Sequence, residues 1–279
     1  MRVVVGGLAE RYSLPPRPAG AAPWVQDAYR QTSFLLADDL ALFRQAMDVQ
    51  LQAASAAAKR RTLESGALFS FWSKTFCHLV DGCSLLCLGS YRSCPPVLRS
   101  ACDCIAAQRA LIRDGFGEYG EWLANAVRQD RKRAAVQIDL GRFRAGSVLA
   151  EDARLGLAYR TLTELSMPHF GSTALQVGPE ISLQKLPLAF AEFGFHLGWA
   201  ELIAGWLLLL CSAQLETIVA SEHIEVTGAA AEAATIVCEQ IAAALSSERR
   251  CYVENAADGL LLHNFRRTPA GAPRRVLLG

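Results

Sequence analysis

The stretch "GALFSFWSKTFCHLVDGCSLLCLGSYRSCPPVLRSACDCIAAQ", residues 66–108, is almost entirely apolar. Its apolar residues recur at helical spacing, and two prolines shortly after Ser93 suit the first turn of a helix. The stretch therefore predicts two consecutive helices, over about 67–91 and 94–113, and the second should end near Gly115 or Gly117.

A few charged side chains interrupt this apolar stretch at regular intervals. Lys74, His78 and Asp81 fall at i, i+4 and i+7, and Arg99 and Asp103 repeat the i, i+4 relation. Such spacing places side chains on one face of a helix, and an unpartnered buried charge is costly. We therefore expect either a structural ion pair between Arg99 and Asp103 or a polar pocket between helices. In a pocket, the arginine would meet an anionic group and the aspartate would orient the arginine.

Outside residues 66–108 the sequence is dominated by alanine-rich segments with helical periodicity. The interpretation is an all-α protein, a single-domain helical bundle of about six to seven helices. The expected divisions are an irregular N-terminal segment at 1–23, a helical bundle domain at 24–250 and a flexible basic tail at 251–279. The other expected helices span about 24–63, 118–144, 147–165, 187–219 and 228–247, with a loop at 167–183. The segments "RVVV" and "RRVLL" are weak strand candidates, and no sheet is predicted.

Composition restricts the class of partner. The chain has 279 residues, 52% of them hydrophobic, and a formal net charge of +1. Near-neutral charge gives no strong nucleic-acid signature, so the arginines at 128–133 and in the tail are interpreted as solvated surface. There is no glycine-rich phosphate loop, and we expect no cofactor. The partners that remain open are a small molecule, another protein, an RNA and a second copy of the chain.

The cysteines and the longest apolar run both suggest a cytoplasmic protein. Six of the nine cysteines lie between Cys77 and Cys104 in helical pattern, without the C-x2-C pairs of zinc ribbons. Buried free thiols in a reducing compartment fit this pattern. The run at 193–215 contains His196 and Glu201, so it predicts a buried core helix rather than a membrane span. The N-terminus has no signal-peptide pattern.

Two segments together resemble a known family. "GSYRSCPPVLRSACDCIAAQRALIRDGFGEYGEWL" and "AYRTLTELSMPHFGSTAL" are similar to elements of an uncharacterised bacterial family of all-helical proteins, catalogued as a domain of unknown function. The resemblance covers about residues 65–180. It implies a ligand-binding set made up of Arg99, Asp103, Tyr159, Ser166 and His169. In that family the acid is usually a glutamate, so Asp103 has a shorter reach.

That family is distantly similar to the HEPN-type helical proteins, many of which are ribonucleases of toxin and defence systems. Their signature is an arginine followed by a histidine four to six positions later. This chain departs from it, since Arg160 precedes His169 by nine positions. Nuclease chemistry, with His169 and Arg99 assisting phosphoryl transfer, is therefore an alternative and not the first interpretation.

The sequence favours a binding or interaction protein with a polar pocket around Arg99, Asp103 and His169. Whether it is also an enzyme stays open. His169 is the first candidate for a catalytic residue, because it follows a helix end where side chains often border a cleft. A further alternative is a metal-assisted bundle enzyme that uses His78, Glu192 and His196. The Glu-x-x-His spacing of bundle metal sites does not occur, so no metal is the primary expectation.

Overall fold

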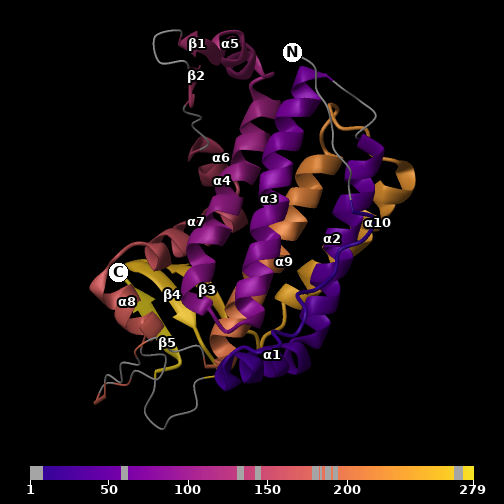
Figure 1. The fold of residues 1–279 in the computed structure, drawn as a ribbon. Helices are drawn as coiled ribbons and strands as arrows, with labels where there is room; N and C mark the ends of the chain where they lie inside the picture. Colours follow the sequence, from indigo (N-terminus) through magenta and orange to yellow (C-terminus); the bar gives the residue numbers. More distant parts are fainter. Residues whose placement is uncertain are drawn as a thin grey trace.

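A bundle of long helices forms the body of the protein, and small β-sheets lie at its two ends (Figure 1). The computed structural model describes residues 9–57, 62–130, 135–141, 146–177, 182, 184–185, 190, 194–266 and 273–279. Residues 9–22 form no helix or strand, as the prolines predict. The fold is mainly helical, which confirms the predicted class in its coarse form.

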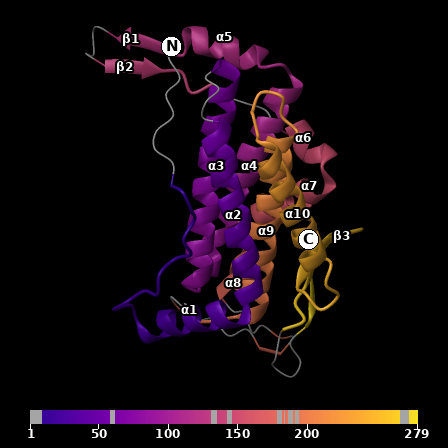
Figure 2. The ribbon, with the colours of Figure 1, turned by 90° about the vertical axis from the view of Figure 1, so that its right-hand side faces the viewer.

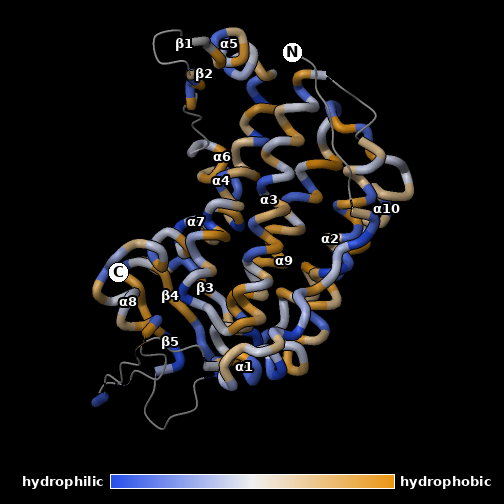
Figure 3. The backbone as a smooth tube through the Cα atoms, in the orientation of Figure 1, coloured by the Kyte–Doolittle hydropathy of each residue, from blue (hydrophilic) through white to orange (hydrophobic). Residues whose placement is uncertain are grey.

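Five long helices build the centre of the bundle. They are α2 (Ala37–Ala57), α3 (Leu63–Cys87), α4 (Cys94–Arg113), α9 (Leu197–Val219) and α10 (Gly228–Leu245). The α3–α4 pair confirms the two helices expected at 66–108, and Gly115 follows α4 with a φ of 64° that suits a helix end. Figure 2 shows the helices side by side from a second direction, and Figure 3 shows hydrophobic residues along α3 and α9. The main core lies where these helices meet.

The structure contains ten α-helices in its described part, more than the six to seven expected. The helix predicted over 24–63 is divided into α1 (Pro23–Leu35) and α2, because Leu36 leaves helical geometry and turns into the core. Asp152 similarly separates α6 (Gly146–Glu151) from α7 (Ala153–Ser166). Its carboxylate caps α7 by accepting from the backbone N–H groups of Arg154 and Leu155. The predicted loop at 167–183 contains α8 (Phe170–Val177).

The prediction of one polar helix over 118–144 is wrong for residues 127–130 and 135–138, and residues 131–134 and 142–144 lie outside the described part of the chain. Helix α5 (Gly117–Asn125) ends early, and β1 (Val127–Asp130) and β2 (Ala135–Ile138) follow as an antiparallel pair. The β-branched residues of this segment alternate in the sequence "AVQI", a period of two that suits a strand. The arginine and lysine residues of this segment favoured a solvated helix in the prediction, but charge alone does not distinguish a helix from an edge hairpin.

The expected flexible tail at 251–279 also differs from the structure. It contains an antiparallel sheet of β3 (Tyr252–Ala256), β4 (Gly259–His263) and β5 (Arg275–Leu278), in the order β3-β4-β5. The Asp258–Gly259 pair at the β3–β4 connection is a hairpin signal, and Leu260 and Leu262 alternate into the interior. The weak strand candidate at 274–278 therefore does form a strand.

Helix α9 is the apolar helix predicted near 187–219, although it begins ten residues later than expected. Residues 187–189 and 191–193 lie outside the described part of the chain. Glu201 is only 7% exposed, and it accepts hydrogen bonds from Arg266 Nε at 2.9 Å and from the Cys251 backbone N–H at 3.3 Å. This buried acid thus fixes the C-terminal sheet onto the bundle.

Two helices, α9 and α10, are long and apolar enough to cross a membrane by length and composition. The apolar window of α9 is 78% buried within the protein, whereas that of α10 is 22% buried. The polar side chains of Gln214 and Ser212 are also buried in α9. These features agree with the core helix that Glu201 predicted.

The nine cysteines are free thiols, and seven of them are buried. Cys77 is exposed and Cys238 is half-buried, so burial is not complete. Small sulfur side chains fill the close contacts between α3, α4 and α9, as their helical spacing predicted.

Candidate ligand-binding site

A cavity of about 620 Å³ lies between α3, α4, α6 and α7. It is lined by Phe71, Lys74, Asp103, Cys104, Ala107, Gly146, Leu149, Ala150, Gly156, Tyr159 and Arg160. The lining combines an apolar wall with charged groups of both signs. A pocket of this size and mixed character is typical of a site for a small molecule.

Tyr159 lies beside the two charged residues that the sequence singled out. Arg99 donates from Nη2 to the Tyr159 hydroxyl at 3.4 Å, and its guanidinium carbon lies 5.5 Å from the centre of the Tyr159 ring. The Tyr159 hydroxyl also lies near the Asp103 carboxylate and lowers the pKa of that acid. Among the described residues no ion pair within 4 Å joins Arg99 to Asp103. The predicted i, i+4 pair is therefore not a direct salt bridge, and a tyrosine from α7 lies beside both residues.

Asp103 carries the one carboxylate among the described residues that line this cavity. Burial raises the pKa of Asp103 above its ordinary value, and the nearby Arg99, the Tyr159 hydroxyl and Lys74 oppose that rise. The result is an acid that is harder to ionise than a surface aspartate. Arg99 itself is half-buried, and its Nε has no hydrogen-bond partner in the described structure.

Positive charge outnumbers negative charge around the cavity. Lys74 comes from α3 and Arg160 from α7, and both side chains are exposed at the cavity rim. No ion pair is formed by Arg160 within the described ranges. Arg99 and Lys74 both lie near Asp103, so together with Arg160 they leave a net positive charge among the described residues at the cavity.

The chemistry of the lining favours binding over covalent catalysis. Cys104 is the one sulfur nucleophile in the lining, and burial raises the pKa of its thiol. A protonated thiol is a poor nucleophile. The histidines of the described chain do not line this cavity, so it has no imidazole base.

The structure separates the predicted ligand-binding set into two groups. Arg99, Asp103 and Tyr159 come together, but Ser166 donates its hydroxyl hydrogen bond to the Leu162 carbonyl of its own helix. His169 lies beyond the end of α7, where its Nε2 is 3.3 Å from Glu164 Oε2. The expectation that His169 borders the pocket of Arg99 is thus corrected. Helix α7 carries Tyr159 toward α4 and ends at Ser166, before His169, which follows Tyr159 by ten residues.

His169 instead lines a different cavity of about 480 Å³ beside β5. The walls of that cavity are Glu164, Gly171, Ser172, Ala174 and Leu175 together with residues 273 and 276–279. Its histidine is exposed and paired with an exposed acid, which is a common surface arrangement.

The predicted metal candidates do not form a cluster. His78 is half-buried, and burial together with Lys74 lowers its pKa. His196 lies at the N-terminus of α9 against the edge of the Tyr91 ring, and Glu192 lies outside the described residues. Within the described ranges no group of three or more His, Cys, Asp or Glu residues could hold a metal ion.

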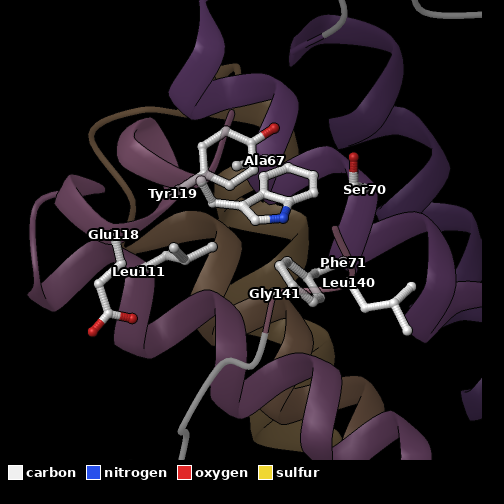
Figure 4. Close-up of a pocket in the computed structure, with 9 residues that line it drawn as sticks. Ala67, Ser70, Phe71, Leu111, Glu118, Tyr119, Leu140 and Gly141 are labelled. Atoms are coloured by element: carbon white, nitrogen blue, oxygen red, sulfur yellow. The ribbon is translucent and has the colours of Figure 1, made fainter. Parts of the chain in front are cut away.

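Sequence reasoning missed a second, aromatic cavity of about 270 Å³ at the α5 end of the bundle. Figure 4 shows its lining residues, which are Ala67, Ser70, Phe71, Leu111, Glu118, Tyr119, Trp122, Leu140 and Gly141. The i, i+3 spacing of Tyr119 and Trp122 in "EYGEWL" was the available signal, since it places both rings on one helix face. Arg160 was missed as well, although it adjoins Tyr159 in the sequence.

Comparison with known proteins finds no matching family model, no matching curated protein and no matching solved structure. The function therefore has to be inferred from the chemistry of the site.

Proposed function

We propose that this protein binds a small organic anion in the cavity between α3, α4, α6 and α7. The observation that carries the proposal is the surplus of positive charge at the cavity, where Lys74 and Arg160 accompany an Asp103 carboxylate that already has Arg99 nearby. A cavity of about 620 Å³ with apolar walls offers room for the organic part of such a ligand. The arginine fork suits a carboxylate, sulfonate or phosphate head.

The test is an NMR titration of the ¹⁵N-labelled protein with butyrate, inorganic phosphate and n-butylammonium. The two anions should shift the amide signals of the cavity residues, and n-butylammonium should not. Arg160→Ala should weaken butyrate binding about tenfold, because a charge-assisted hydrogen bond to the anion is lost. The matched control is Arg44→Ala, which removes an exposed helical arginine from α2 outside the cavity.

Equal binding of n-butylammonium and butyrate would contradict an anion site. Equal affinity of Arg160→Ala and Arg44→Ala for butyrate would do the same, because charge at the cavity would then have no part in recognition.

The raised pKa of Asp103 predicts how binding depends on pH. As pH falls through that pKa, Asp103 loses its negative charge and stops repelling a bound anion, so affinity should rise. Butane-1-sulfonate is the suitable probe, since it stays ionised throughout. Asp103→Asn should bind it about fivefold to tenfold more tightly at neutral pH and without the pH dependence.

The remaining groups at the cavity do not provide a competing explanation in this pH range. Burial raises the pKa of Cys104, so that thiol stays neutral, and arginines stay charged. Calorimetric titration of both proteins between neutral and mildly acidic pH measures the effect. An unchanged pH profile in Asp103→Asn would remove Asp103 from the recognition site.

The ribonuclease and metal-enzyme alternatives receive less support from the geometry. His169 lines the cavity beside β5, whereas Arg99 donates to Tyr159 at the other cavity, so the geometry gives no support for their acting on one phosphate. The metal alternative needs three converging ligands, and the described residues supply no such group.

A further inference from the structure

The two cavities lie along one seam between α3 and α4. On α3, the lining residues Ala67, Ser70, Phe71 and Lys74 follow at i, i+3, i+4 and i+7, and therefore share one face. Phe71 lines both cavities. The aromatic cavity and the polar cavity are thus neighbours along α3, and Phe71 forms part of the wall of each.

The facing helix α4 also lines both cavities, but along α4 the residues of the polar cavity come first and the residue of the aromatic cavity comes later. Asp103 and Cys104 line the polar cavity, and Leu111, two turns later, lines the aromatic cavity. At about 1.5 Å rise per residue, the seven residues from Lys74 to Ala67 correspond to roughly 10 Å along α3. Figure 1 shows the same order in the covering elements, with α7 toward one end of α4 and α5 at the other.

The aromatic cavity is preformed. Trp122 donates from Nε1 to the Asp139 carbonyl at 2.8 Å, and its ring lies 5.6 Å from that of Tyr119. A Cβ atom on Gly141 would come within 2.6 Å of the Trp122 ring, so the backbone packs directly on the indole. Both contacts fix the indole as a rigid wall of the cavity.

Among the described residues that line the aromatic cavity, none is a cation that could receive an anionic head. The Ser70 hydroxyl already donates to the Gly66 carbonyl at 2.9 Å, and Glu118 carries a like charge. The cations Lys74 and Arg160 line the polar cavity. Charge therefore fixes the direction of an amphipathic ligand, with its head at Arg160 and its chain toward Trp122.

We infer that the ligand is a free medium-chain carboxylate whose alkyl chain passes Phe71 and enters the aromatic cavity. This inference rests on the proposed function and adds a substrate class to it. Each methylene that enters the aromatic cavity should tighten binding about fourfold.

The experiment is a titration with butyrate, hexanoate, octanoate and decanoate below their micelle concentrations. Affinity should rise about fourfold per methylene and level off once the two cavities are filled. The longer acids should also shift the Trp122 indole N–H signal, assigned with Trp122→Phe, and butyrate should not. Decylammonium should bind far more weakly than decanoate, because Lys74 and Arg160 repel it.

Ser70→Trp tests the path of the chain directly, because it adds a large ring at the rim of the aromatic cavity from an exposed position. Decanoate should then bind this variant no more tightly than butyrate, while butyrate affinity stays unchanged. Ser73→Trp is the matched control, since Ser73 is also exposed on α3 but lines neither cavity. It should keep the full chain-length effect.

The failures of the two proposals are distinguishable. Butyrate binding that depends on Arg160 but gains nothing from added methylenes would overturn the amphipathic ligand and leave the anion site standing. Absence of any binding by butyrate and decanoate alike would overturn the anion site. Equal loss of decanoate affinity in Ser70→Trp and Ser73→Trp would contradict the assigned path of the chain.

Discussion

Replacing Arg250 by alanine should lower the free energy of unfolding by about 3–5 kcal/mol, because it leaves a buried acid without its partner. Arg250 and Asp39 are 11% and 12% exposed, and they form a two-pronged ion pair with distances of 2.9 and 2.8 Å. Arg250 also donates to the Glu201 carbonyl at 3.2 Å. One side chain thus joins the start of α2, helix α9 and the segment before β3.

Chemical denaturation measures this effect. Arg249→Ala is the matched control, since Arg249 is exposed, and its free energy of unfolding should change by less than about 0.5 kcal/mol. The double variant Arg250→Met with Asp39→Leu should recover much of the loss, because it removes both charges. Equal stability of Arg250→Ala and Arg249→Ala would show that the ion pair contributes nothing.

The second large effect is expected at the closest contact between α3 and α4. Leu98 is fully buried, and a Cβ atom on Gly82 would lie 2.8 Å from its Cδ2 atom and 3.2 Å from Leu207 Cδ2. Leu98→Ala should cost about 2–5 kcal/mol through the lost burial and the cavity left behind. Gly82→Ala should cost about 1–3 kcal/mol, because it overfills the same space.

The effects of Leu98→Ala and Gly82→Ala on the free energy of unfolding should not be additive. Once Leu98 is alanine, the methyl group of Gly82→Ala has room and supports the helix, so the second change should become neutral or stabilising. Urea unfolding of the two single variants and the double variant gives the coupling energy. Gly120→Ala is the control, since nothing lies within 4 Å of its added Cβ. Additivity within about 0.5 kcal/mol would contradict the contact.

Local pattern predicted the parts of this fold that local physics decides. The periodicity of residues 66–108 is enough to predict α3 and α4, and the same spacing places Arg99 and Asp103 on one helix face. Glu201 in an apolar run correctly indicated a core helix. Each of these features depends on residues within a few turns of one another, where sequence spacing and spatial spacing are the same.

Breaks and short strands were less predictable. The helix breaks at Leu36, whose side chain is buried against other parts of the fold. The periodicity of the segment itself does not show this burial. The β3-β4-β5 sheet depends on β5 returning to β4 and on Arg266 reaching Glu201, 65 positions away. Asp258–Gly259 and Asp152 were readable local signals, for a hairpin and for a helix cap.

For the site, the sequence by itself determined which charged residues share a helix face, and the tertiary structure decided what they meet. Arg99 and Asp103 were identified from their i, i+4 spacing, but their common neighbour Tyr159 lies 60 positions from Arg99 on another helix. Ser166, at i+7 from Tyr159, shares its helix face but bonds to the Leu162 carbonyl of its own helix, and His169 follows the end of α7 and pairs with Glu164. A helix rotates its side chains by about 100° per residue, so small differences in position decide which neighbour a residue faces, and only the packing of α7 on α4 sets that direction.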